Sequence, residues 1–190
     1  YRGFKAGVTL EEFDASLKAG TVEELLVRCP VTSGDLIYIP GGTVHAIGEG
    51  CLILEVQQNS NTTYRVYDWN RKGPDGKTRA LHLDEARKVI HWESDEVHQP
   101  ADDGRCSTLY FTIECTTLGK RALNVIDPLK GFTVVFIEEG SVVFQFDGRE
   151  VPAAVGTTWL LPAALRKCRL ARATPTEPAR VVVIRGKPAA

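Results

Sequence analysis

The sequence predicts a mainly β protein built from two similar units, with a small helical hairpin at its N-terminal end. Short apolar runs alternate with turns rich in Gly, Pro, Asn and Asp along most of the chain, which is typical of antiparallel strands. An apolar strand framed by glycine and proline occurs twice, from Gly34 to Pro40 and from Gly156 to Pro162, at an offset of 122 residues. This internal repeat indicates two copies of one β unit.

The composition is that of a globular protein with no nucleic-acid or membrane partner. Of the 190 residues, 43% are hydrophobic and 25% are charged, so the chain can bury a core. The net charge of −1 gives no sign of binding to nucleic acid or an anionic membrane, and no apolar run approaches the ~20 residues of a membrane helix. Five dispersed cysteines without a C-x-x-C pair predict reduced thiols in a cytoplasmic protein. The chain has no methionine and no signal-peptide pattern, and we expect it to be a piece of a longer protein.

Residues 1–33 are expected to contain the helical hairpin. Thr9 and Thr21 are each followed by glutamate three residues later, the capping-box pattern that begins a helix, and Gly20 separates the two predicted helices within residues 9–28. Apolar residues recur at helical spacing on one face of the first helix: Leu10, Phe13 and Leu17. The acidic residues are expected to be solvated, so this hairpin carries no chemistry of its own.

Residues 34–100 begin with a strand, a sharp turn and a histidine. A strand is predicted over Leu36–Ile39; Pro40 ends it, and the two glycines that follow allow the backbone to turn. His45 then lies at the start of the next strand, where a rigid hairpin would direct its imidazole inward as a metal site requires. Taken alone, the motif favours the alternative of an ordinary half-buried histidine.

Two further strands are predicted over Leu52–Gln57 and Thr62–Tyr67. Because side chains alternate between the faces of a strand, Glu55 and Arg65 each occupy a polar face of a strand rich in apolar residues. If these faces line the interior of a barrel, His45, Glu55 and Arg65 converge there. The alternative is a structural ion pair between Glu55 and Arg65, since buried charges require partners. The pattern does not separate these two interpretations.

Three blocks of the sequence resemble a known enzyme family: Pro40–Gly48, Leu54–Ser60 and Thr63–Trp69. They are similar to the signature of the type I mannose-6-phosphate isomerases in their short bacterial form, which belong to the cupin superfamily. The resemblance runs from about Gly3 to about Ile90 and continues more weakly to the C-terminus, so the chain resembles the C-terminal part of such an enzyme. It implies cupin jelly-roll barrels, the first incomplete and the second complete.

The resemblance also implies a function and roles for individual residues. The family interconverts mannose 6-phosphate and fructose 6-phosphate with the help of a zinc ion. His45 matches a zinc ligand, Glu55 matches an active-site carboxylate, and Arg65 matches an arginine that is essential near the reacting end or the phosphate of the sugar. Asn61 occupies a substrate-binding position where the family usually has an aspartate that was proposed as an acid/base group. Since an amide cannot take up a proton, that role is in doubt or belongs to Glu55 or to a water molecule.

These residue types suit the isomerisation of an aldose to a ketose, which moves a proton between C1 and C2 through an enediol. A metal ion can polarise the sugar oxygens, and a carboxylate can shuttle the proton. An arginine can stabilise the charge of an enediolate or bind a phosphate with two hydrogen bonds.

The chain lacks the rest of the family's zinc site. The family's other ligands, a Gln-x-His pair and a following glutamate, lie upstream of the matched region, and no Q-x-H occurs in this sequence. The remaining histidines, His82, His91 and His98, are interpreted as structural or surface residues. Because catalytic zinc normally has three protein ligands, we expect the zinc site to be incomplete and this piece alone to be inactive.

Residues 101–190 are predicted to form the second, complete barrel. A short helix over Leu83–Ile90 and a linker over residues 91–107 precede it. Its predicted strands are Leu109–Cys115, Arg121–Ile126, Phe132–Ile137, Val142–Phe146, the repeated glycine-to-proline strand and Val181–Ile184. The offset of 122 residues places Lys167 at the position of His45, which predicts a barrel without a metal.

The repeat also indicates what the first unit lacks. In the second copy several strands precede the glycine-to-proline strand, whereas in the first copy only the helical hairpin does. We therefore expect a missing N-terminal segment or a partner chain to complete the first barrel, and exposed apolar residues around Leu52–Val56 without it.

Two classes of function stay open. The first is an isomerase acting on a sugar phosphate, of which this chain is the C-terminal part. The second is a non-catalytic cupin that binds sugars or has a regulatory role. A metal-dependent dioxygenase of the cupin superfamily is a more distant third, because it has no evident use for Glu55 and Arg65. An upstream segment carrying Gln-x-His and a glutamate would distinguish the first class from the second.

Overall fold

The computed structural model describes residues 1–60, 62–92, 104–126 and 131–187. The chain divides into two compact units, one made of Tyr1–Thr32 and Ile37–His98 and the other of Ser33–Leu36 and Gln99–Ala190. The predicted divisions at residues 33 and 100 remain predictions, and each unit is described by itself. None of the helices in the described ranges has the length and apolar character needed to span a bilayer.

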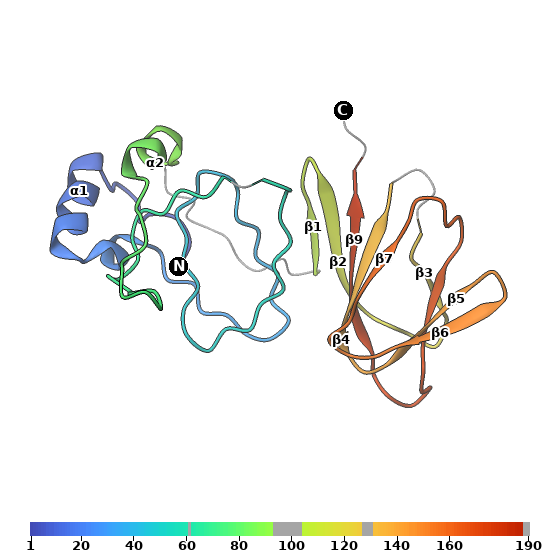
Figure 1. Cartoon of the computed structure of the whole chain (residues 1–190). Coiled ribbons are helices and arrows are strands. Elements are labelled where there is room, and N and C mark those ends of the chain that lie inside the picture. The colour runs from blue at the N-terminus through green and yellow to red at the C-terminus, as the bar shows by residue number, and fades with distance from the viewer. Residues whose placement is uncertain (61, 93–103, 127–130, 188–190) are drawn as a thin grey trace. The chain divides into compact units, whose positions relative to one another are not determined.

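The second unit consists of two antiparallel sheets (Figure 1). The five-stranded sheet has the order β1-β2-β9-β4-β7, formed by β1 (Arg105–Ser107), β2 (Phe111–Thr117), β9 (Arg180–Gly186), β4 (Thr133–Glu139) and β7 (Thr158–Leu161). The four-stranded sheet has the order β3-β8-β5-β6, formed by β3 (Leu123–Asn124), β8 (Arg169–Arg172), β5 (Val142–Phe146) and β6 (Arg149–Ala153). The neighbours in both sheets are largely distant in sequence, as expected for the predicted jelly roll.

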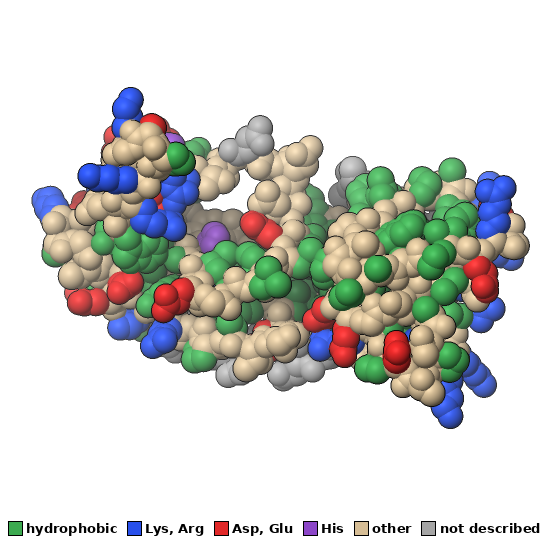
Figure 2. All heavy atoms as spheres, turned by 60° about the horizontal axis from the view of Figure 1, so that its bottom comes forward, with side chains coloured by type: hydrophobic (Ala, Val, Ile, Leu, Met, Phe, Trp, Pro, Cys, Tyr) green, Lys and Arg blue, Asp and Glu red, His purple; other side chains and the backbone are tan. Residues whose placement is uncertain are grey.

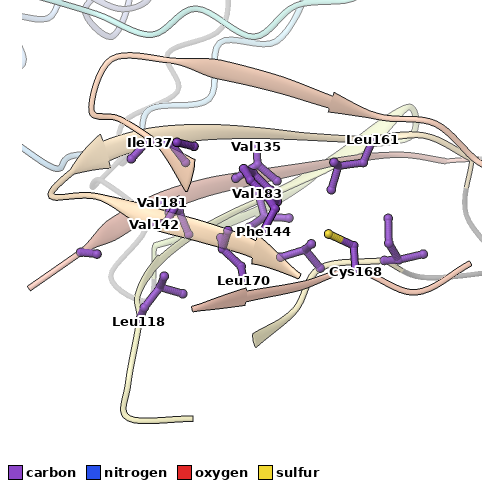
Figure 3. Close-up of a cluster of buried hydrophobic side chains, with 14 residues drawn as sticks. Leu118, Val135, Ile137, Val142, Phe144, Leu161, Cys168, Leu170, Val181 and Val183 are labelled. Carbon is purple, nitrogen blue, oxygen red and sulfur yellow. The ribbon is translucent and has the colours of Figure 1, made fainter. Parts of the chain in front are cut away.

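Side chains from both sheets form the core of this unit (Figure 3). In β4, Val135 and Ile137 are fully buried while the residues between and beside them are partly exposed, because successive side chains point to opposite faces. Phe144 of β5 packs on Trp159 of β7 with ring centroids 5.1 Å apart, which links the two sheets. The unit therefore has a hydrophobic core of its own.

The strands of the second unit differ from the predicted ones where the apolar pattern is weak. β5 has the predicted bounds, and β2 begins and ends two residues later than predicted. β8 was not predicted, because an arginine stands at each of its ends and Leu170 is its one large apolar residue. It forms because its backbone pairs with β5 and with β3. The predicted linker over residues 91–107 includes β1. Residues 93–103 of this linker lie outside the described part of the chain.

The first unit begins with helix α1 (Leu10–Ala19), which has the predicted capping box. The Glu12 backbone N–H donates to Thr9 Oγ1 over 3.2 Å, and the Thr9 N–H donates to the Glu12 carboxylate over 2.9 Å. The second helix of the predicted hairpin is instead a single 3-10 turn, η1 (Val22–Leu25), and Thr21 forms no capping hydrogen bond. The reason is that Leu26 pairs its backbone with Phe4, which draws the chain into an extended conformation.

An aromatic cluster holds the helical part of the first unit together. Phe4 stacks on Trp92 with ring centroids 5.3 Å apart, and Phe13 packs edge-on against both rings. Phe4 and Phe13 are fully buried, and Val22 joins them. Helix α2 (Leu83–Val89) agrees with the predicted helix and ends next to this cluster.

The rest of the first unit contains none of the three predicted strands over Leu36–Ile39, Leu52–Gln57 and Thr62–Tyr67. The described residues of these segments run as loops (Figure 1). An extended segment becomes a strand only when a neighbouring strand accepts and donates its backbone hydrogen bonds, and no strand of the described chain pairs with these segments. Their apolar side chains are accordingly at the surface: Leu52 is fully exposed and Ile53 is 51% exposed.

Exposed apolar side chains are expected in a β unit that lacks some of its strands. Leu54 is also exposed, so three consecutive large apolar residues face solvent. Such a run is unusual at the surface of a folded domain. Figure 2 shows hydrophobic side chains at the surface among charged ones. The described residues of the first unit therefore form no complete barrel, as predicted from the internal repeat.

Candidate functional site

The turn before His45 is fixed by close packing. The Thr43 N–H donates to the Pro40 carbonyl over 3.2 Å, and Gly42 has a φ of +86°. A Cβ atom on Gly42 would lie 2.5 Å from the carbonyl oxygen of Val89, at the end of α2. Only glycine fits this position, so the turn is seated firmly against the segment that follows the helix.

His45 itself is held on both sides by the N-terminal segment. The Gly3 N–H donates to the Val44 carbonyl over 2.8 Å, and the Ala46 N–H donates to the Tyr1 carbonyl over 3.0 Å. The Nδ1 atom of His45 lies 3.0 Å from the carbonyl oxygen of Thr43. Because a carbonyl can only accept, Nδ1 is the donor in this contact, and in the neutral imidazole this leaves the lone pair on Nε2.

This arrangement is the one that histidine ligands of metals usually have. Their second ring nitrogen donates to a carbonyl or carboxylate, which fixes the tautomer and the direction of the ring. Thr43 Oγ1, two residues away, is buried without a hydrogen-bond partner in the described part of the chain, as a polar atom beside an unfinished site would be. His45 therefore fits a zinc ion as one ligand. No group of three His, Cys, Asp or Glu side chains that could hold a metal occurs among the described residues.

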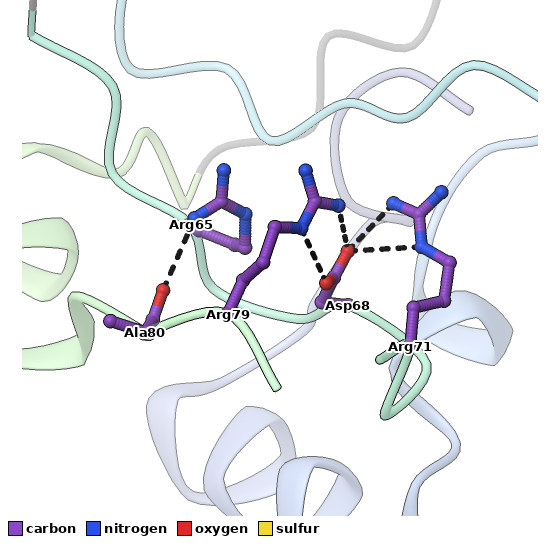
Figure 4. Close-up of polar contacts among 5 residues, drawn as sticks. All are labelled: Arg65, Asp68, Arg71, Arg79 and Ala80. Atoms are coloured by element: carbon purple, nitrogen blue, oxygen red, sulfur yellow. Dashed lines mark hydrogen bonds and ion pairs between the residues drawn. The ribbon is translucent and has the colours of Figure 1, made fainter. Parts of the chain in front are cut away.

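Arg65 is held to the residues that precede α2. Its backbone N–H donates to His82 Nδ1 over 3.1 Å, and its carbonyl accepts from the His82 N–H over 2.8 Å. Its guanidinium donates through Nη1 to the Ala80 carbonyl over 3.2 Å (Figure 4). Both the backbone and the side chain of Arg65 are therefore positioned by residues 80–82.

Asp68 is a buried carboxylate between two arginines (Figure 4). Arg79 donates to both of its oxygens, through Nε to Oδ2 over 2.7 Å and through Nη2 to Oδ1. Arg71 donates to Oδ1 through Nη2 over 2.6 Å. The hydrogen bonds from Arg79, helped by those from Arg71 and opposed by burial, hold the pKa of Asp68 well below its ordinary range. The carboxylate is therefore charged, and it ties residues 68, 71 and 79 together.

The other two predicted site residues are less constrained. Glu55 is exposed, and in the described part of the chain no hydrogen bond or ion pair joins it to Arg65, so the alternative of a structural ion pair is wrong here. The two residues lie in segments that form no strands here, so no shared sheet face brings their side chains together. Asn61 lies outside the described residues. The convergence of His45, Glu55 and Arg65 in one cavity stays a prediction.

The sequence reasoning missed Asp68, Arg79 and the contact of His82 with Arg65. A single acid next to two aromatic residues, with arginines three and eleven positions later, was the signal for the buried carboxylate. His82 was interpreted as a structural or surface residue, and no local pattern indicated that its side chain accepts from a backbone 17 residues earlier.

No family model matches this chain. Among curated proteins, it is 39% identical over 172 residues to the mannose-6-phosphate isomerase ManA of Bacillus subtilis, a match that covers 85% of this chain and 54% of the relative. It is 50% identical over 80 residues to the mannose-6-phosphate isomerase of Streptococcus mutans, covering 42% of this chain and 25% of that protein. The crystal structure of the mannose 6-phosphate isomerase from Bacillus subtilis superimposes with a TM-score of 0.72 at 26% identity, over 97% of this chain and 59% of that one. The chain spans about half the length, or less, of the curated relatives that it matches.

Proposed function

The chain is a relative of the mannose-6-phosphate isomerases, and we propose that it is part of an enzyme that interconverts mannose 6-phosphate and fructose 6-phosphate. The observation that carries this proposal is the identity of 39% to the Bacillus subtilis enzyme over 85% of the chain. The five free cysteines suit a cytoplasmic enzyme.

Arg65 has the geometry for binding an anionic oxygen of the substrate. Only one of its guanidinium hydrogen bonds, to Ala80, is formed within the described residues, so other N–H groups remain for a ligand. A guanidinium can stabilise the negative charge of an enediolate or bind a phosphate with two parallel hydrogen bonds. The side chain is half-buried, which strengthens such contacts relative to water.

His45 would hold zinc through Nε2, with the remaining ligands contributed from outside the described residues. Bound zinc would polarise the carbonyl or hydroxyl oxygen of the sugar. Glu55 would take the proton from C2 of the aldose and return it to C1, while the hydroxyl proton passes from O2 to O1; the two transfers together convert mannose 6-phosphate to fructose 6-phosphate. Asn61 would bind the sugar through its amide, since it cannot transfer a proton.

The exposed loops of the first unit would pair with strands from an upstream segment or a partner chain. Leu52, Ile53 and Leu54 are exposed, and their segment has the residue types of a strand but no backbone partner in the described chain. Burial of these side chains would supply the driving force for pairing, and the same strands would bring further zinc ligands.

The second candidate function is a non-catalytic cupin that binds sugars or has a regulatory role. Asn61 favours it, because this position carries an amide where a proton-transferring aspartate is usual in the family. Such a protein would bind a sugar phosphate without converting it.

A coupled assay of mannose 6-phosphate turnover tests the proposal on a longer protein that contains this chain. Arg65→Ala should lower kcat by about 10²–10³, as expected for the loss of one oriented donor to a charged transition state. Arg166→Ala, at an exposed arginine of the second unit, is the matched control and should leave turnover unchanged. If the zinc-loaded protein binds mannose 6-phosphate without turnover, the non-catalytic function is correct. If Arg65→Ala behaves like Arg166→Ala, the role of Arg65 is wrong.

A further inference from the structure

Arg65 is anchored by a residue that the proposed chemistry does not use. His82 forms two hydrogen bonds with it in opposite directions: Nδ1 accepts from the Arg65 N–H over 3.1 Å, and the His82 N–H donates to the Arg65 carbonyl over 2.8 Å. Both backbone polar groups of Arg65 are thereby satisfied by one residue that lies 17 positions later. The contact resembles one rung of a β ladder in which an imidazole replaces one carbonyl.

His82 is itself fixed in place because it is the N-cap residue of α2. Its carbonyl accepts the first hydrogen bond of the helix, from the Ala86 N–H over 2.9 Å, and Ala86 is buried. Its side chain does not cap the helix, although a capping side chain is common at this position, and it accepts from Arg65 instead. An ion pair of 2.7 Å between Arg87 and Asp14 holds the helix to α1. Arg65 is therefore attached to the start of a supported element.

The direction of the hydrogen bond determines the tautomer of His82. A backbone N–H can only donate, so Nδ1 must present a lone pair and the proton resides on Nε2. His45 has the opposite tautomer, with its proton on Nδ1. A doubly protonated His82 would direct an N–H at the N–H of Arg65 and break the contact.

A second anchor lies three residues beyond Arg65. Arg79 binds the buried Asp68 through two hydrogen bonds (Figure 4), so the segment from Arg65 to Asp68 is tied at both ends to the segment from Arg79 to His82. The loop between these segments turns back through Lys72 and Thr78, whose backbones also pair. Without His82, the hydrogen bonds that join these two segments in the described chain would be those of Asp68 with Arg79 and the single contact of the Arg65 guanidinium with Ala80.

We propose that His82 is a positioning residue for Arg65, and that its neutral imidazole, protonated at Nε2, sets the direction in which the Arg65 guanidinium meets the substrate. This inference rests on the proposed function only in assuming that Arg65 binds the substrate. The hydrogen bond and the tautomer are properties of the chain itself.

The test compares two substitutions in the longer protein. His82→Ala removes the acceptor, whereas in His82→Asn the side-chain oxygen can take the place of Nδ1 and accept from the Arg65 N–H. We expect His82→Ala to lower kcat by about 10- to 10²-fold with a small change in KM, as for a misplaced catalytic group, and His82→Asn to recover most of the loss. Equal kcat in the two variants, whether impaired or normal, while Arg65→Ala shows its expected loss, would overturn the positioning role and leave the proposed function standing.

A nuclear magnetic resonance measurement tests the contact without any activity. In the 190-residue chain labelled with nitrogen-15, a scalar coupling between the Arg65 amide nitrogen and His82 Nδ1 should be detected, and the Nδ1 shift should be that of an unprotonated nitrogen. A second outcome is that His82→Ala lowers the melting temperature and His82→Asn restores it without restoring kcat. That result would show a purely structural role for His82. A His82 protonated at Nδ1 would contradict the inference whatever the enzyme does.

Discussion

Replacing Gly42 by alanine should destabilise the first unit strongly, and replacing its neighbour Gly41 should not. Gly42 has a φ of +86°, a conformation that costs a residue with a side chain about 1–3 kcal/mol. The added Cβ would also lie 2.5 Å from the Val89 carbonyl oxygen and 2.9 Å from the His91 ring, an overlap that costs about 1–3 kcal/mol to relieve. We therefore expect Gly42→Ala to lower the free energy of unfolding by ~2 kcal/mol or more.

Gly41 is a matched control on the same turn. A Cβ there would have no atom within 4 Å, and Gly41 does not have a positive φ. Gly41→Ala should therefore leave stability nearly unchanged or raise it slightly, because alanine restricts the unfolded chain. Urea unfolding of both variants, monitored by the fluorescence of Trp92 in the aromatic cluster next to the turn, measures the difference. Equal midpoints for the two variants would refute the argument that this turn is closely packed against residues 89–91.

Two further predictions concern charge and thiol reactivity. The hydrogen bonds from Arg79 lower the pKa of Asp68 below its ordinary value of 3.8, so the stability that the carboxylate contributes is present above that pH and is lost as the pH falls toward the lowered value. Asp68→Asn should therefore be less stable at pH 7 and lose less stability than the unmodified protein between pH 4 and pH 2; parallel curves of melting temperature against pH would contradict this. Cys51 is exposed, whereas Cys168 is buried and burial raises the pKa of its thiol, so a thiol reagent should modify Cys51 first. Survival of the fast phase in Cys51→Ser would show that another thiol is the exposed one.

The second unit could be predicted well because its main strands are rich in apolar residues, as buried strands are. In β4 every second residue is fully buried, and β5 alternates in the same way, so the sequence alone identified both. β8 has arginines at both ends and one buried leucine, Leu170. It is a strand because its backbone pairs with β5, and the residue types do not indicate that pairing. Strand length was also less predictable, because it depends on backbone pairing. The expected strand Arg121–Ile126 is only the two residues of β3.

The first unit shows where sequence reasoning fails for a physical reason. Residues 52–57 have the composition of a strand, yet a strand also requires a neighbour, and the described chain offers none. Thr21 has the residue pattern of a helix cap, yet the pairing of Leu26 with Phe4 ends the turn after four residues. The contact between His82 and Arg65 joins a side chain to a distant backbone, so no periodicity could indicate it. The sequence thus names candidate residues through its resemblance to a family, but it does not indicate the contacts that hold Arg65 in place.

The proposed isomerisation is tested most directly by following mannose 6-phosphate in heavy water by proton magnetic resonance, with zinc and a longer protein that contains this chain. We expect that fructose 6-phosphate forms, that solvent deuterium enters the sugar next to the carbonyl as the proton passes through Glu55, and that Arg65→Ala slows both by about 10²–10³. Mannose 6-phosphate that binds the zinc-loaded protein and yet remains unchanged and undeuterated would contradict the proposed isomerase function.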